Sequence, residues 1–225
     1  MDKDIEMNWL KSFQSYLFAT MVIPTNSLTD WKTEKFSSVP KNETTASSNG
    51  LLIQVKNSAG PIIFPLKSKI KILGFKISGE FQDLPKILNP SLQGEKGFDD
   101  YPLRLGFVIP GERKLSGFKK MMAAQWIKNL YEQVKDGGGI DSVHFFNVTQ
   151  NPRQVGKIRT HPASDLFQEE FFAAVKQSGP FAYDYQFEKP LEAIAIWLSI
   201  DGDDTKSAFN VLVSSLELIV SGGEK

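Results

Sequence analysis

Three aspartates lie within four residues, at Asp201, Asp203 and Asp204, and form the most conspicuous group of potential metal ligands in the sequence. Calcium is a hard cation that takes about 6–8 oxygen ligands, so these carboxylates could contribute to a calcium site. The segment is a poor match to the helix–loop–helix calcium motif, because no helix is predicted on either side. The alternative is a solvated turn between two core strands, where Asp and Gly are common.

A second candidate pair is Asp100 and Arg104, at the start of a predicted strand. In an extended chain, residues two positions apart share a face, so Asp100, Pro102 and Arg104 are expected on the same side. An acid and a guanidinium there could fix a polar ligand through charge-assisted hydrogen bonds. They could equally form a structural ion pair at the end of the strand.

His144 is the third candidate ligand-binding residue, within the largely apolar run Val143 to Asn147. Alternation places His144 and Phe146 on one face of a strand, which is also typical of a histidine in the core or at its rim. The chain has two histidines and no HExxH spacing, so no zinc motif is present. The absence of cysteine excludes thiolate nucleophiles and Cys-ligated metals.

Sequence motifs for catalysis are missing: there is no G-x-S-x-G serine motif and no P-loop. Glycosidase carboxylates come from separate strands and leave no local motif, so a glycan-active enzyme remains an alternative. Aromatic residues could stack on sugar rings or fill the core. The candidates for stacking are Trp31, Trp126, Trp197, Tyr183 and Tyr185.

The charge balance argues against a nucleic-acid partner. Lys plus Arg and Asp plus Glu number 26 each, whereas nucleic-acid binders usually carry a basic excess. No apolar run approaches the roughly 20 residues that a transmembrane helix needs. The chain as it stands shows no export signal, so we expect a cytoplasmic protein, or a periplasmic or exported one if a leader has been removed.

The elements that must position these residues are mostly strands. Apolar or alternating runs predict strands over 31–36, 51–56, 62–66, 69–81, 101–109, 140–149, 155–160, 191–200 and 208–220. The runs 51–56 and 62–66 flank an Asn- and Gly-containing turn and predict a hairpin, as do 191–200 and 208–220 around the acidic turn. Helical spacing predicts helices over Ile5–Phe18 and Gly117–Lys135, and helical character over Ser164–Lys176.

Many short strands separated by Gly and Pro turns favour a mainly β fold, a jelly-roll-like β-sandwich decorated by the N-terminal helix and one long inserted helix. Residues 1–24 are expected to be a helical segment packed on a single β-sandwich domain formed by residues 25–225. Facing sheets would bring the Asp100–Arg104 strand and the acidic turn to the edges of the molecule.

Two segments carry a family resemblance: 98–110, which reads FDDYPLRLGFVIP, and 194–205, which reads IAIWLSIDGDDT. They resemble the "DD-aromatic-x-x-R" strand and the closing "D-x-D-[DN]-T" motif of a bacterial family of uncharacterised domains. That family is similar to exported jelly-roll sandwiches of the galactose-binding and carbohydrate-binding-module kind. His144-Phe145-Phe146 departs from the family's Tyr-x-Trp strand.

The resemblance supports the fold more than an activity. For a fold of this kind the first hypothesis is a non-catalytic binding module for a saccharide or another polar cell-envelope ligand. The residues that we expect at the ligand are Asp100, Arg104 and His144, with calcium at the acidic turn. Function does not follow from fold alone, so two alternatives stay open. One is a hydrolase or lyase acting on glycans through carboxylates in a sandwich cleft. The other is a structural or assembly protein, which would expose a large apolar patch.

Overall fold

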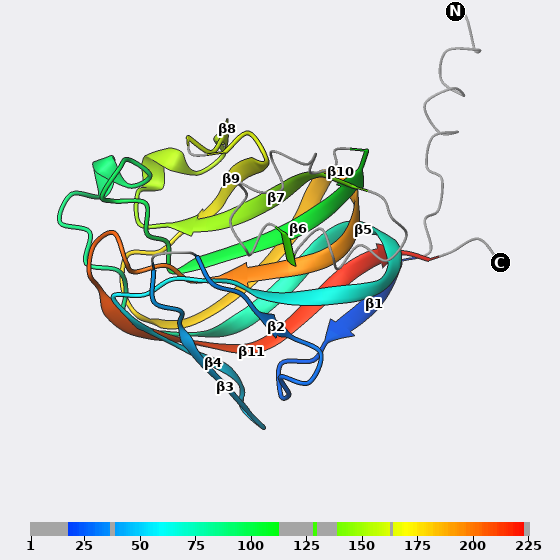
Figure 1. The fold of residues 1–225 in the computed structure, drawn as a ribbon, viewed down its shortest axis with the longest axis horizontal. Coiled ribbons are helices and arrows are strands. Elements are labelled where there is room, and N and C mark those ends of the chain that lie inside the picture. The colour runs from blue at the N-terminus through cyan, green and yellow to red at the C-terminus, as the bar shows by residue number, and fades with distance from the viewer. Residues whose placement is uncertain (1–17, 37–38, 113–127, 130–138, 163, 223–225) are drawn as a thin grey trace, which may run out of the picture.

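The computed structural model describes residues 18–36, 39–112, 128–129, 139–162 and 164–222. Strands dominate these residues, so the prediction of a mainly β fold is confirmed (Figure 1). The strands are β1 (Phe18–Ile23), β2 (Lys32–Thr33), β3 (Glu43–Ser47), β4 (Gly50–Lys56), β5 (Ile62–Gln82), β6 (Leu103–Gly111), β7 (Gly139–Thr149), β8 (Ile158–Thr160), β9 (Phe167–Ala174), β10 (Gly179–Ser199) and β11 (Ala208–Ser221). Two 3₁₀ turns join them, η2 (Pro90–Leu92) and η3 (Pro152–Gln154). Over the same residues, no helix has the length and hydropathy needed to cross a membrane.

Within the described residues the strands form one eleven-stranded sheet in the order β3-β4-β11-β5-β10-β6-β7-β9-β8, with β1 paired to β11 and β2 to β5. The parallel pair is β7–β9, and the other pairs are antiparallel. The sheet is continuous in its hydrogen bonds, which differs from two separate facing sheets. The jelly-roll description therefore stays a prediction.

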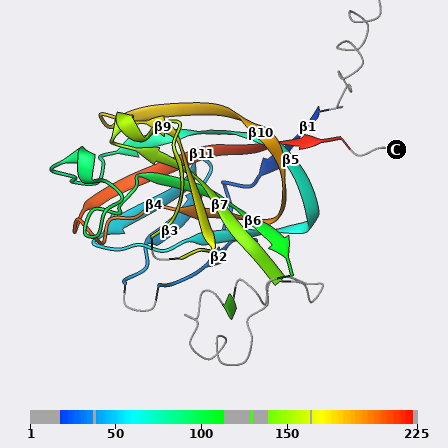
Figure 2. The same cartoon turned by 90° about the horizontal axis from the view of Figure 1, so that it is seen from above.

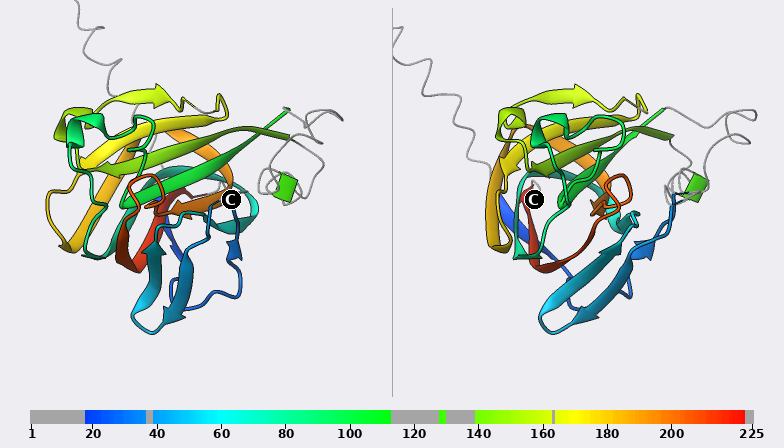
Figure 3. Two further views of the ribbon diagram at one scale, coloured as in Figure 1. Left: turned by 60° about the vertical axis from the view of Figure 1, so that its left-hand side comes forward. Right: turned by 90° about the vertical axis from the view of Figure 1, so that its left-hand side faces the viewer.

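The sheet curls over on itself to form two layers around a core (Figures 2 and 3). The strands β5 and β10 have 21 residues each and pair along most of their length, with register shifts that let them bend. Phe75 of β5 contacts Phe107 of β6 and Phe172 of β9, which are not its neighbours in the strand order. These contacts show that β5 packs across the core against β6 and β9.

The alternation of β11 explains why it can hold the centre of one layer. Phe209, Val211 and Val213 are buried, and after a register shift between Val213 and Ser215 burial passes to Leu216 and Leu218. A β-bulge inserts one residue and so reverses the alternation of faces beyond it. The buried positions therefore change from odd-numbered to even-numbered residues, and the apolar side of the strand stays on the core.

Both predicted hairpins are wrong. β11 lies between β4 and β5, with Val211 opposite both Ile53 and Phe81. In the same way, β5 separates β10 from β11. Local turn residues suggested the hairpins, but the strands pair instead with partners that are distant in sequence.

The predicted helical character over Ser164–Lys176 is also wrong, because β9 occupies 167–174 and pairs with β7 and β8. Residues 18–23, assigned from sequence to the N-terminal helical segment, form β1 on the edge of β11. The rest of the helix predicted over Ile5–Phe18 lies outside the described residues. So does the helix predicted over Gly117–Lys135, apart from residues 128–129, which have helical backbone.

Candidate functional site

A row of outward-facing side chains crosses the strands β10, β6 and β7 on the side away from the main core. Strand pairing sets Ser199 opposite Arg104, and Arg104 opposite Asn147. Leu103 and Leu105, the neighbours of Arg104 in sequence, point into the main core. Alternation in β6 thus places one guanidinium on a face where Val108, Phe145 and Trp197 form a smaller, buried apolar cluster.

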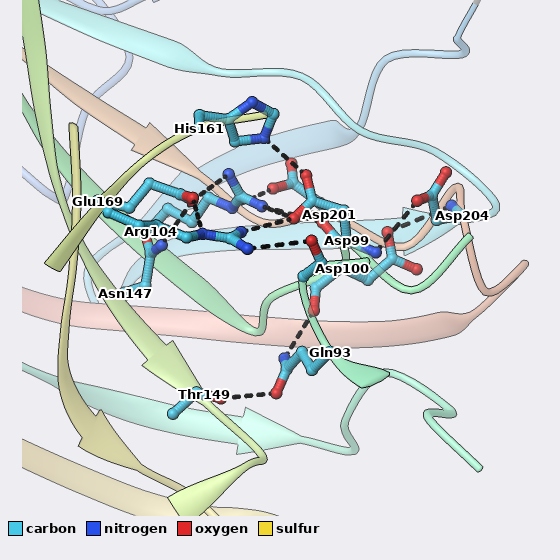
Figure 4. A network of polar contacts seen from close by, with 12 residues as sticks. Gln93, Asp99, Asp100, Arg104, Asn147, Thr149, His161, Glu169, Asp201 and Asp204 are labelled. Carbon is cyan, nitrogen blue, oxygen red and sulfur yellow. Dashed lines mark hydrogen bonds and ion pairs between the residues drawn. The ribbon is translucent and has the colours of Figure 1, made fainter. Parts of the chain in front are cut away.

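Arg104 is the centre of a network of buried ion pairs (Figure 4). Its Nε lies 2.9 Å from Oδ2 of Asp201, its Nη1 lies 3.2 Å from Oε1 of Glu169, and its Nη2 lies 3.3 Å from Oδ1 of Asp99. Its guanidinium also stacks 4.3 Å from the centre of the Tyr101 ring. Burial disfavours charge on Arg104, but the three carboxylates raise its pKa above the ordinary value.

Glu169 connects Arg104 to a second arginine. Its side chain is fully buried and accepts a hydrogen bond of 2.7 Å from Nε of Arg159 and one of 2.9 Å from Nδ2 of Asn147. Arg159 on β8 also donates to the backbone oxygen of Gly94. The parallel strand β9 and the short strand β8 therefore complete the network that begins on β6.

The loop before β6 and the loop after β10 lie at the same end of the molecule and are fastened together (Figure 1). The carboxylate of Asp100 accepts hydrogen bonds from the backbone amides of Asp204 and Thr205 and from the Thr205 hydroxyl. In return, the Asp204 carboxylate accepts hydrogen bonds from the backbone amides of Gly97 and Asp99. These bonds satisfy backbone groups that would otherwise lack partners.

A pocket of about 210 Å³ opens beside Arg104, between these loops and the outer face of the sheet. Its lining combines aromatic side chains with polar side chains that are mostly acidic. Its lining consists of Phe36, Ala59, Asp99, Arg104, Phe145, His161, Phe167, Trp197, Ser199, Asp201, Asp203 and Asp204.

Two carboxylates on this pocket have opposite pKa shifts. Burial raises the pKa of Asp201 to about 8, because the nearby carboxylates of Asp100 and Asp203 add to burial and together outweigh Arg104. Burial also acts on Asp99, but Arg104 and a 2.8 Å hydrogen bond with Nε2 of His161 bring its pKa below the ordinary value. The pocket thus holds one carboxyl that tends to be neutral and one that stays ionised.

The predicted pairing of Asp100 with Arg104 is wrong. Asp100 lies before β6, is fully buried and holds the loop at Thr205, while Asp99 takes the place beside Arg104. The prediction assumed that the strand already begins at Asp100, whereas β6 begins at Leu103. Arg104 does line the pocket, and Asp100 does not.

His144 lies on the opposite face of β7 from this pocket. It stacks on Phe146 with ring centres 4.9 Å apart, and its Nε2 lies 3.6 Å from a carboxylate oxygen of Glu170. Tyr185 donates a short hydrogen bond to the same carboxylate. A ligand contact by His144 therefore stays a prediction, separate from the Arg104 pocket.

The three aspartates of the acidic turn have separate roles. Asp201 pairs with Arg104, Asp204 caps the neighbouring loop, and Asp203 lines the pocket. Among the residues with described positions, no three His, Asp or Glu side chains are arranged to hold a metal ion. Calcium binding at this turn stays a prediction.

Sequence reasoning missed Glu169, because it read residues 164–176 as helical. It also passed over Arg159, although that residue lies in the strand predicted over 155–160. The available signal was period-two alternation: Phe167, Glu169 and Phe171 share a face of β9, which puts a carboxylate among apolar neighbours. A charge on an apolar face is rarely buried without a partner. That pattern would have predicted a buried ion pair.

No family model matches the sequence, and no curated protein matches it. Similar solved structures include one described as xylan-binding module CBM15, with a TM-score of 0.38, 10% identity, and coverage of 92% of this chain and 99% of that chain. Another is the VIP36 exoplasmic/lumenal domain in its Ca2+/Man2-bound form, with a TM-score of 0.37, 10% identity, and coverage of 92% and 89%. At TM-scores below 0.5, these similarities identify neither the fold family nor the function of this chain.

Proposed function

We propose that this protein is a binding module that accepts a ring of a saccharide in the pocket beside Arg104. The observation that carries the proposal is the pairing, in one pocket, of an aromatic wall with a fixed polar wall. A sugar ring has apolar faces and a hydroxyl rim, so it suits a site that is apolar on one side and hydrogen-bonding on the other.

The aromatic wall is built from three rings that hold one another in place. Phe145 packs edge-on against Phe167 and Trp197, with distances between ring centres of 5.3 Å and 5.5 Å. The ring centres of Phe167 and Trp197 are 6.0 Å apart. Phe145 and Trp197 are only 2% and 1% exposed, so they support the half-buried ring of Phe167, on which a ligand would stack. A preorganised wall of this kind lowers the cost of binding.

The polar wall is equally fixed, because Arg104, Asp99 and Asp201 restrain one another. The pocket volume of about 210 Å³ lies below the range of roughly 300–1,000 Å³ typical of sites for drug-sized ligands. This size favours one ring, or the end of a longer chain, over an extended oligosaccharide.

The proposal is tested by calorimetric titration of the full chain with a panel of monosaccharides and oligosaccharides. We expect one or more to bind, and Phe167→Ala to weaken that binding about tenfold because a stacking ring is lost. Phe18→Ala is the matched control, since Phe18 is 67% exposed on β1 and does not line the pocket. If no saccharide binds, or if both variants have equal effects, the proposal is wrong.

A second candidate function, glycan hydrolysis, is favoured by the opposite pKa shifts of Asp201 and Asp99. A neutral carboxyl can serve as a general acid and an ionised one as a base or nucleophile, which is the division of labour in glycosidases. Release of new reducing ends from a bound oligosaccharide would support this function. Binding without any such release, in wild type and Asp201→Asn alike, would exclude it for that ligand.

A further inference from the structure

The pocket carries more negative than positive charge. Four of its lining residues are aspartates, at positions 99, 201, 203 and 204, and the lining arginine is Arg104. Each guanidinium nitrogen of Arg104 already faces a carboxylate, including that of Glu169. The charge of Arg104 is therefore shared among its partners, and little of it is left for a ligand.

One carboxylate oxygen at this pocket lacks a partner. Oδ2 of Asp201 faces Arg104, but Oδ1 is buried and accepts no hydrogen bond from any residue whose position is described. The whole residue is only 7% exposed. A buried acceptor without a donor is unfavourable, so such an atom indicates a group that arrives from outside the chain.

The aromatic wall faces the same space. Phe145, Phe167 and Trp197 line the pocket together with Asp201; Phe145 and Trp197 are buried, and the half-buried Phe167 is the ring of the three that a ligand could contact. Aromatic faces are negative at their centres and attract cations, more strongly where water is excluded. The acidic wall and the aromatic wall thus favour the same kind of ligand group.

We propose that the ligand carries a protonated amine, as an amino sugar does, and that this ammonium donates a hydrogen bond to Oδ1 of Asp201 beside the aromatic wall. This rests on the proposed function, because it names the chemical class of the saccharide. An ammonium has donors and no acceptor, which complements an acceptor-only carboxylate. A carboxylate or phosphate on the ligand would instead be repelled by the ionised aspartates of the pocket.

Binding of an amine at Asp201 should be coupled to the release of a proton. Asp201 is surrounded by Arg104 on β6, by Asp99 and Asp100 before β6, and by Asp203 on its own loop, with His161 hydrogen-bonded to Asp99. An arriving cation lowers the pKa of Asp201 from about 8, so binding near neutral pH releases a proton. The binding heat then depends on the ionisation enthalpy of the buffer.

The test is calorimetric titration of the full chain at neutral pH with glucosamine, glucose, N-acetylglucosamine and ethanolamine. We expect glucosamine to bind about tenfold more tightly than glucose or N-acetylglucosamine, because a charge-assisted hydrogen bond is made only by the amine. Asp201→Asn should abolish that preference, with circular dichroism confirming its fold. Asp184→Asn is the matched control, since Asp184 pairs with Lys76 on the surface and should leave the preference unchanged.

Each remaining outcome separates the two proposals. Equal binding of glucosamine and glucose would overturn the amine assignment and leave the saccharide module standing. Binding of ethanolamine that Asp201→Asn removes, without binding of any saccharide, would support the amine site and overturn the proposed function. Calcium binding that depends on Asp201 and excludes glucosamine would overturn the amine assignment in favour of a metal. If Asp201→Asn does not fold, Asp203→Asn must reduce the preference instead, and a full preference in that variant would contradict the proposal.

Discussion

Arg104 is the positive charge that balances three carboxylates of the site. It is 7% exposed and has ion pairs with Asp99, Asp201 and Glu169, which come from three separate parts of the chain. A planar guanidinium can serve several carboxylates at once, whereas a lysine ammonium is a point charge. The geometry therefore depends on arginine at this position.

The first prediction concerns removal of this charge. Arg104→Met should lower the free energy of unfolding by about 3–5 kcal/mol, because it leaves buried carboxylates without their partner. Urea denaturation followed by fluorescence measures the change. Lys76→Met is the control, since it breaks the exposed pair with Asp184 and should cost roughly 0–1 kcal/mol. A similar small loss for both variants would show that the Arg104 network adds little to stability.

The second prediction concerns pH and Asp201. Its pKa in the folded protein, about 8, exceeds its ordinary value of 3.8, so between these values the folded state binds more protons than the unfolded state. The free energy of unfolding contributed by this group therefore falls as pH rises through that window and is level above it. Asp99 acts oppositely: its pKa is lowered, so its contribution is present above its ordinary value and is lost as pH falls through its folded pKa.

Denaturation curves across that window, for wild type and Asp201→Asn, measure the effect. The variant cannot titrate at this position, so its free energy of unfolding should decline less with rising pH than that of wild type. Asp184→Asn, an exposed carboxylate with a surface partner, should follow the wild-type curve. Parallel curves for wild type and Asp201→Asn would refute the raised pKa.

The sequence identified the site residues that local sequence marks as unusual. It missed those whose position depends on where a strand begins or on which strands pair. Asp201 was selected as one of three aspartates within four residues, and Arg104 because it was expected to share a strand face with Asp100. Asp99 was passed over for Asp100, since the choice depends on where the strand begins, and alternation alone does not fix that residue. Glu169 was missed because its segment was read as helical. The alternation of Phe167, Glu169 and Phe171 indicated burial, but the parallel pairing of this strand with β7 could not be read from neighbouring residues.

At the scale of elements, close packing between β6 and β7 shapes the aromatic wall. Gly106 of β6 lies opposite Phe145 of β7. A Cβ added at Gly106 would come within 2.7 Å of the Phe145 ring and 3.1 Å of Cβ of Trp197. The ring of Phe145 occupies the space that a side chain on β6 would need.

The third prediction follows from this contact. Gly106→Ala should lower the free energy of unfolding by about 1–3 kcal/mol through overpacking and should weaken saccharide binding by displacing the Phe145 ring. Thermal unfolding and calorimetric titration measure the two effects. Adding Phe145→Leu should restore part of the lost stability but not the binding. If Gly106→Ala binds like wild type, the ring does not contribute to the wall.

The strands themselves were largely predictable, whereas their partners were not. Apolar and alternating runs located β7 and β11 almost to their ends. In β11 the buried residues alternate, whereas both faces of β7 are buried over residues 145–149. Turn residues then suggested hairpins that the structure does not contain. Turn chemistry constrains only neighbouring strands, and the final order is decided by burial between segments more than a hundred residues apart, such as β4 and β11.

The whole molecule is one hydrogen-bonded sheet over the described residues, and its two layers share the strands β5 and β10. Neither layer can keep its pairing if the other is lost, because each 21-residue strand contributes to both. The Asp100–Thr205 bonds add a further connection across 105 residues of sequence. The architecture therefore favours a single cooperative unit.

The fourth prediction is that thermal unfolding of the full chain is a single transition. Calorimetric and van't Hoff enthalpies should agree, as they do when no intermediate is populated. Arg104→Met should shift this transition to lower temperature without splitting it. Two resolved transitions, or a calorimetric enthalpy well above the van't Hoff value, would show that the layers unfold independently.

The insertion of β11 between β4 and β5 also has a consequence for folding during synthesis. During synthesis β4 and β5 leave the ribosome long before β11, and until it arrives each presents an unpaired edge. Because of the turn between them, β4 and β5 can pair directly with each other. That hairpin is non-native and would be a kinetic trap in folding. The strand β11 must therefore displace this non-native pairing or prevent it. A chain truncated before Ala208 would leave the edges of β4 and β5 unpaired and open to pairing with other chains.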